Sequence, residues 1–271
     1  MFTIKQSVKS LGALSLLAAS TLSFSGLAHA GAFDSGIPAA WTCTGNCGTL
    51  GANGVVTASP EGGNYGWIAS NTGITGLGLP GYGGTDGTRL RTGTFSAAAG
   101  DDLEFYFNYV TSDGAGFSDY AWVRLLDGAQ NEVAILFTAR TTPTGDTVPG
   151  FGLPGLADGV VLEPPSTPII PGGPVWSPLG GYSGACYSAG CGYTGWIGMT
   201  YNIALAGNYA LEFGVVDMID QIYDSGMAFD GILVGGISIE EPDNGIPEPA
   251  SLALLGIGLV GLGAMRRRKT A

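Results

Sequence analysis

Apolar and polar side chains alternate along several short stretches of the chain. The clearest stretch is 103–109, Leu-Glu-Phe-Tyr-Phe-Asn-Tyr, in which Leu, Phe, Phe and Tyr occupy every second position. A period of two residues indicates a β-strand with one buried face. The same reading predicts further strands at 89–95, 120–126, 132–138, 209–216 and 232–239.

Turn-forming residues separate these stretches. Gly, Ser, Thr and Asn recur every ten or so positions, and no segment of residues 31–241 shows a sustained period of 3.6 residues. Short strands with frequent turns predict an all-β fold, an antiparallel jelly-roll-like β-sandwich. A β-solenoid is the alternative, but the sequence has no fixed repeat period.

The N-terminus carries an uninterrupted apolar run. Lys5 and Lys9 precede the apolar residues 11–17, and small residues lead to Ala28-His29-Ala30. This order predicts a signal peptide over residues 1–30, cleaved after Ala30. The secretion translocon and signal peptidase are therefore expected partners.

A second apolar run, residues 250–265, lies near the C-terminus. At about 1.5 Å per residue it covers roughly 24 Å, a minimal membrane span against a hydrocarbon core of about 30 Å. A basic tail, residues 266–271, follows it and contains Arg266, Arg267, Arg268 and Lys269. These charges predict a stop-transfer signal and a cytoplasmic tail, with the preceding chain exported across the inner membrane.

Pro247-Glu248-Pro249 closes the linker 242–249 directly before this apolar run. Pro-Glu-Pro, an apolar Leu/Gly-rich span and a terminal Arg cluster together resemble the PEP-CTERM sorting signal. The resemblance implies a substrate of exosortase in a Gram-negative bacterium that makes exopolysaccharide. It also implies cleavage near Pro247-Glu248-Pro249 and a final location at the cell surface or in the extracellular matrix.

Residues 31–241 form one exported β-domain in this interpretation, and its charge is strongly negative. Residues 31–249 contain 22 acidic residues and only four basic ones, which gives a formal charge of −18. The basic residues are Arg89, Arg91, Arg124 and Arg140. This disfavours nucleic acid and anionic lipid as partners and makes cations the natural counterparts. The same charge also keeps an exported protein soluble.

The exported segment contains neither histidine nor lysine, because His29 is the only histidine and no lysine lies between Lys9 and Lys269. This excludes Ser-His-Asp and Cys-His catalysis, histidine zinc sites and lysine Schiff bases. We therefore expect no enzyme. A carboxylate-pair glycosidase is the surviving alternative, with candidate acids Asp101, Asp102, Glu104 and Glu212.

The four cysteines fall into two local pairs. Cys43 and Cys47 are separated by three residues, and Cys186 and Cys191 by four. In an oxidising compartment these pairs predict two small disulfide loops, Cys43–Cys47 and Cys186–Cys191. Crossed pairings and a tetrathiolate metal site remain as alternatives.

The segment 141–199 interrupts the strand rhythm and holds nine of the fifteen prolines. It is also aromatic, and two interpretations follow. Either the aromatic side chains stack on glycan rings, or they fold back on the sandwich as a small core. The residues concerned are Trp176, Tyr182, Tyr187, Tyr193 and Trp196.

Four aspartates crowd residues 217–230, in what we expect to be one turn between strands. Because like charges repel unless a cation holds them, Asp217, Asp220, Asp224 and Asp230 form a candidate calcium site. Their spacing does not match an EF-hand, and water-exposed turn residues are the alternative. The stretch from Asp224-Ser225 to Asp230-Gly231 also resembles the last hairpin of extracellular β-sandwich domains, which implies a lectin-like or matrix-protein fold.

The sequence therefore favours an envelope or matrix protein associated with exopolysaccharide. A carbohydrate-binding module and a carboxylate glycosidase are the alternatives.

Overall fold

The computed structural model describes residues 33–240. The predicted signal peptide, the Pro-Glu-Pro motif, the apolar run 250–265 and the basic tail lie outside these residues. Within residues 33–240, no helix is both long and apolar enough to cross a membrane.

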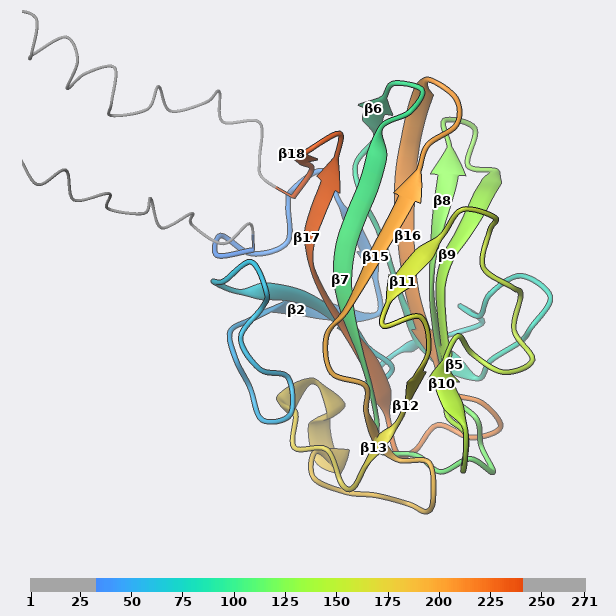
Figure 1. The fold of residues 1–271 in the computed structure, drawn as a ribbon. Coiled ribbons are helices and arrows are strands. Elements are labelled where there is room, and N and C mark those ends of the chain that lie inside the picture. Colours follow the sequence, from blue (N-terminus) through green and yellow to red (C-terminus); the bar gives the residue numbers. More distant parts are fainter. Residues whose placement is uncertain (1–32, 241–271) are drawn as a thin grey trace, which may run out of the picture.

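Two antiparallel sheets form the body of the molecule (Figure 1). The seven-stranded sheet has the order β1 (Thr42–Thr44), β5 (Asp86–Arg91), β16 (Gly207–Val216), β8 (Tyr120–Asp127) and β9 (Glu132–Arg140), with β4 (Ile74–Thr75) on β5 and β6 (Phe95–Ala97) on β16. All its strand pairs are antiparallel.

The nine-stranded sheet has the order β11 (Val161–Glu163), β15 (Ile197–Asn202), β7 (Asp102–Thr111), β17 (Ser225–Val234), β3 (Tyr65–Ala69) and β2 (Asn46–Leu50). Three short strands extend it: β13 (Ile170–Pro171), β14 (Gly192–Tyr193) and β18 (Ile237–Ser238). A separate pair, β10 (Asp146–Val148) with β12 (Thr167–Pro168), and one 3₁₀ helix, η1 (Ser177–Tyr182), complete the described residues. The predicted all-β antiparallel sandwich is confirmed.

Aromatic rings from both sheets meet in the core. Phe105 of β7 lies 5.9 Å from Phe213 of β16, and Phe213 stacks on Phe229 of β17 at 4.4 Å between ring centroids. All three side chains are buried. The alternation along β7 thus directs its odd-numbered residues into the core and leaves Glu104 and Tyr106 on the outer face.

Two of the predicted strands are wrong as continuous elements. Residues 89–95 are divided between β5 and β6, and residues 232–239 between β17 and β18. In the second case Gly235 and Gly236 adopt positive φ angles of 55° and 78°, which form a tight turn. The other predicted strands lie inside longer observed ones.

Both predicted disulfides are present. Cys43 lies on β1 at the edge of one sheet and Cys47 on β2 at the edge of the other, so this bridge links the two sheets. Gly45 forms the corner between them at φ +107°, and a Cβ there would meet Thr88 Oγ1 at 2.3 Å. Only glycine fits this corner.

Candidate functional site

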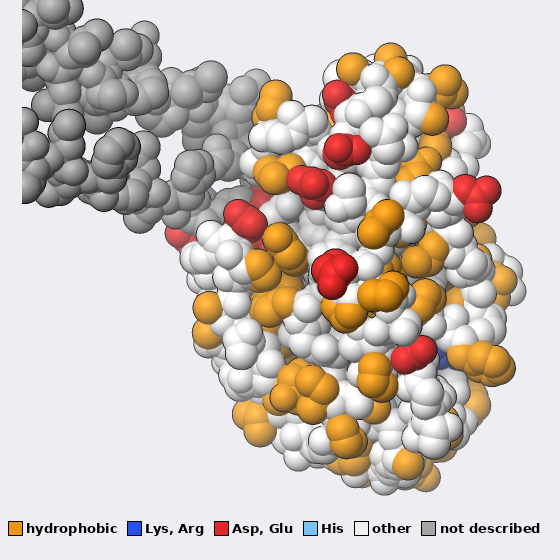
Figure 2. All heavy atoms as spheres, viewed as in Figure 1, with side chains coloured by type: hydrophobic (Ala, Val, Ile, Leu, Met, Phe, Trp, Pro, Cys, Tyr) orange, Lys and Arg blue, Asp and Glu red, His pale blue; other side chains and the backbone are white. Residues whose placement is uncertain are grey.

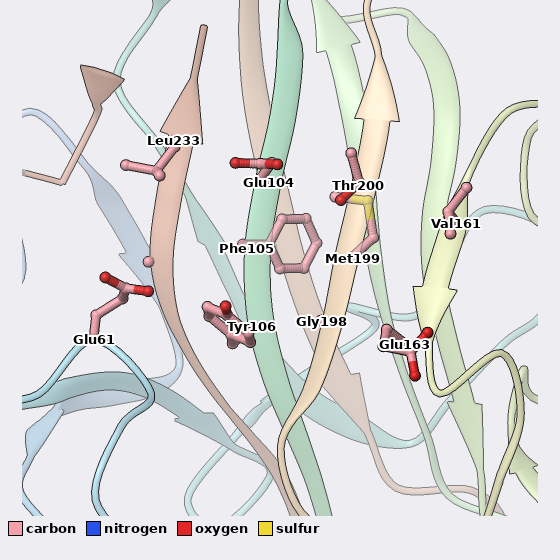
Figure 3. A pocket seen from close by; sticks show the side chains of 11 residues that line it. Glu61, Glu104, Phe105, Tyr106, Val161, Glu163, Gly198, Met199, Thr200 and Leu233 are labelled. Carbon is pink, nitrogen blue, oxygen red and sulfur yellow. The ribbon is translucent and has the colours of Figure 1, made fainter. Parts of the chain in front are cut away.

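A groove crosses the outer face of the nine-stranded sheet (Figure 3). Strand register aligns two rows of residues beneath it. One row is Val161, Thr200, Glu104 and Leu233, and the other is Glu163, Gly198, Tyr106 and Asp230. We call this the outer-face groove; its volume is about 320 Å³, near the lower limit of small-molecule sites.

Small residues keep the Tyr106 ring uncovered. Gly198 is its cross-strand neighbour on β15, and Gly231 interrupts the pairing of β17 with β7 at a bulge. Gly231 has φ +69°, and a Cβ there would lie 3.1 Å from the Tyr106 ring and 2.9 Å from Glu61 Cγ. A larger residue at position 231 would therefore crowd the groove.

Three glutamates line the same groove as Tyr106. Glu61 and Glu163 lie on opposite sides of Tyr106, and Glu104 lies on the same strand as Tyr106 (Figure 3). None of the eleven lining residues is basic. Figure 2 shows acidic side chains spread over the same face of the molecule. The groove thus combines hydrogen-bond acceptors with apolar and aromatic contact surface.

Asp230 lies beside the groove, covered by the chain at Ser59. Its Oδ2 accepts a hydrogen bond from the Ser59 hydroxyl, and its Oδ1 has no partner among residues 33–240. Burial raises the pKa of Asp230 to about 6. Because Asp230 lies inside β17, the expectation that it shares one turn with the other three predicted aspartates is wrong; residues 225–234 form a buried strand.

Asp217 follows the end of β16, and Asp224 directly precedes β17. Three more aspartates lie at the start of β5, after the end of β7 and before the start of β8. We call Asp86, Asp113, Asp119, Asp217 and Asp224 the acidic end cluster. Asp119 and Asp217 are fully buried, whereas Asp220 is half-buried nearby. Among the described residues, no three acidic, cysteine or histidine side chains already converge as a metal site.

Burial raises the pKa values of this cluster. Burial and the nearby Asp224 and Asp86 carboxyls raise the pKa of Asp217 to about 8, although the Ser70 and Asp119 side chains moderate the effect. Burial and Asp86 raise the pKa of Asp224 to about 7. Burial also raises the pKa of Asp119 well above its usual range.

Raising the pH from 5 to 8 in buffer with a chelator should lower the melting temperature. In the folded chain Asp230 has a pKa of about 6 and Asp217 of about 8, whereas an unfolded Asp titrates near 3.9. The folded chain therefore binds more protons than the unfolded chain across this range, so stability falls as pH rises. Thermal melts at each pH check this, and a melting temperature that rises towards pH 8 would contradict it.

The predicted stacking aromatics do not form one exposed surface. Trp176 is fully buried, and its indole Nε1 donates a hydrogen bond to the Tyr65 hydroxyl at 3.0 Å. Tyr193 and Trp196 are half-buried against the same cluster. Trp176 therefore cannot stack on a glycan. It instead belongs to a small core that packs against the sandwich, the second of the two interpretations.

Tyr182 and Tyr187 lie elsewhere, with their rings 4.7 Å and 5.1 Å from the Tyr223 ring. Tyr182 is half-buried and Tyr187 is exposed. These two tyrosines remain accessible. They share a surface with Tyr223, which the sequence analysis did not include among the stacking candidates.

The candidate glycosidase acids are also dispersed. Asp101 accepts a hydrogen bond from the Ala98 amide, and Asp102 accepts one from the Asn202 side chain. Glu212 is buried among arginines. Of the four, only Glu104 lines the outer-face groove. The sequence analysis did not identify Glu61, Tyr106 or Glu163 as site residues. For Tyr106 a signal was present, because the alternation in 103–109 places it on the outward face beside Glu104.

Comparison with protein families gives a match at residues 245–269. The chain carries a PEP-CTERM protein-sorting motif. This agrees with the resemblance found at Pro247-Glu248-Pro249, and the motif indicates an exported protein that is processed by an exosortase. No curated protein matches the chain.

Solved structures give low-identity matches to this chain. One is the K1 cleaved adhesin domain of Lys-gingipain from Porphyromonas gingivalis W83, with 15% identity, a TM-score of 0.39, and coverage of 76% of this chain and 96% of that domain. The K3 cleaved adhesin domain of the same protein has 15% identity, a TM-score of 0.35, and coverage of 74% and 95%. The enzymatically active domain of bacteriophage CBA120 tailspike protein 4 has 13% identity, a TM-score of 0.31, and coverage of 73% and 20%.

Proposed function

We propose that this PEP-CTERM protein is an envelope or matrix protein that associates with exopolysaccharide through the outer-face groove. The observation that carries the proposal is the placement of Tyr106 between Glu61 and Glu163, with Glu104 on the same strand. The sorting motif supports delivery to the surface on which such a polymer is found. Residues 250–265 would hold the chain in the inner membrane until an exosortase cleaves it.

The groove suits the two chemical faces of a sugar. The Tyr106 ring and the Leu233 side chain offer apolar contact to the C–H face of a pyranose. The carboxylates of Glu61, Glu104 and Glu163 accept hydrogen bonds from hydroxyl groups. Because no basic side chain lines the groove and the exported segment carries −18, neutral or amino-bearing glycans fit better than uronic-acid polymers.

Replacing Tyr106 with alanine should weaken polysaccharide binding at least about tenfold, or about 1.4 kcal/mol, because the variant loses the aromatic contact surface. Affinity electrophoresis of the exported chain in gels containing neutral, amino-bearing or uronic-acid polysaccharides measures this effect. Tyr82→Ala is the matched control, since Tyr82 is 38% exposed and lies outside the groove. Equal retention of the two variants, or no retention of the wild type by any polymer, would contradict the proposal.

Three glutamates in one groove also favour a second candidate, a carboxylate glycosidase. The same incubations separate the two functions. Release of new reducing ends that is lost in Glu104→Gln supports hydrolysis. Retention without release supports binding alone.

A further inference from the structure

We propose that the acidic end cluster binds one divalent cation. Because its ligands would be carboxylate oxygens in irregular geometry, that cation is calcium. The cluster lies at the junction of the two sheets, where β5, β8 and β17 begin and β7 and β16 end. The outer-face groove lies elsewhere along β7 and β17, at residues 104–106 and 231–233, and its lining residues include no member of the cluster.

The first supporting observation is a buried carboxyl group, Asp217, whose polar neighbours, Ser70 and Asp119, do not satisfy its oxygens with hydrogen bonds of ordinary geometry. Asp217 is fully buried, and neither of its carboxylate oxygens has a hydrogen bond of ordinary geometry within residues 33–240. Asp113 is 1% exposed, and its Oδ2 also lacks a partner in that range. An ionised carboxylate that is buried without a donor or cation is costly, so these oxygens favour the binding of a cation.

The arginines do not supply that charge. Arg89, Arg91 and Arg124 surround Glu212 on the outer face of the seven-stranded sheet. Arg140 donates its hydrogen bonds to the carbonyl oxygens of Ser118 and Phe151. The exported segment has no other basic side chain.

Hydrogen bonds donated by backbone amides fix the segments that carry the cluster. The Asp217 amide donates to the Asp86 carbonyl at 2.9 Å, and the Ser112 amide to the Asp224 carbonyl at 3.1 Å. The Met218 amide donates to Asp119 Oδ1 at 2.9 Å. The backbones are thereby held together independently of any ion, while the free oxygens of Asp217 remain available.

Asp86, Asp217 and Asp224 are the expected carboxylate ligands. Each of these carboxyls lies close enough to the other two for mutual repulsion, and Asp86 is partly exposed, which gives an ion access. They do not converge on one point in the structure, so binding requires their side chains to rotate inward. Calcium accepts six to eight oxygens in irregular geometry, whereas magnesium requires a near-ideal octahedron, so calcium should bind more tightly.

Isothermal titration calorimetry of the chelator-treated exported chain with calcium chloride at pH 7.5 tests the proposal. We expect one calcium per chain and a higher melting temperature with calcium. Asp217→Asn should weaken affinity at least tenfold while the chain stays folded, because the amide is a neutral, equal-sized replacement. Asp158→Asn, at an exposed loop position, should bind as the wild type does.

Three results would overturn the proposal. The first is no calcium heat and no thermal shift in the wild type. The second is magnesium binding as tightly as calcium. The third is calcium binding that survives in Asp217→Asn but is lost in Asp230→Asn, which would place the ion beside the groove instead.

Discussion

Replacing Glu212 with alanine should lower the free energy of unfolding by about 3–5 kcal/mol, the range for breaking a buried ion pair. The Glu212 side chain is fully buried. Arg91 Nη2 lies 2.6 Å from its Oε2, and Arg124 Nη2 lies 2.8 Å from its Oε1, with Arg89 Nε at 3.6 Å. Burial raises the pKa of Glu212, but hydrogen bonds from Arg91 and Arg124 outweigh burial and lower it. The variant would leave Arg89 and Arg91 without an ion-pair partner among residues 33–240, and Arg124 paired only with Glu132.

Glu132→Ala is the matched control for this network. Glu132 pairs with Arg124 Nη1 at 3.2 Å, but its side chain is 42% exposed, so its loss should cost less than about 1 kcal/mol. Urea denaturation of both variants measures the difference. If both lose the same small amount, the arginines do not depend on Glu212, and its assignment as a structural residue is wrong.

Replacing Trp176 with alanine should cost about 3–5 kcal/mol, the usual range for a buried tryptophan. Its ring packs against Gly226 of β17 and makes an edge contact with Trp67, whose ring centroid lies 6.5 Å away. The Tyr65 hydroxyl would also lose its indole donor. Chemical denaturation followed by circular dichroism measures the loss.

Tyr187→Ala provides the comparison within the same segment. Tyr187 is 48% exposed and contacts the rings of Phe117 and Tyr223, so its removal should cost about 1 kcal/mol. A Trp176→Ala variant as stable as Tyr187→Ala would show that Trp176 does not anchor the segment.

The sequence predicted the local features of this molecule well, because their physical causes are local. Alternation in 103–109 places Phe105 inside and Tyr106 outside without reference to any other strand. The cysteine spacings favoured short bridges for the same reason. The sequence did not show that Cys43–Cys47 joins two sheets, because that depends on the partners of β1 and β2.

The site depends on pairing between distant segments. Glu163, Gly198 and Tyr106 become neighbours only because β11 and β15, from the proline-rich segment and its end, pair with β7. The acidic end cluster likewise joins Asp217 and Asp224 to Asp86, which comes from a strand more than a hundred residues earlier. Such contacts leave no periodic signal in a single sequence.

Nuclear magnetic resonance titration of the ¹⁵N-labelled exported chain tests the groove most directly. The probes are gluco- and chito-oligosaccharides of four to six units. The account predicts saturable shifts of the backbone amides of Tyr106, Thr200 and Leu233, and their loss in Tyr106→Ala. Shifts confined to the Tyr182 and Tyr187 surface, or no shift with any oligosaccharide, would contradict it.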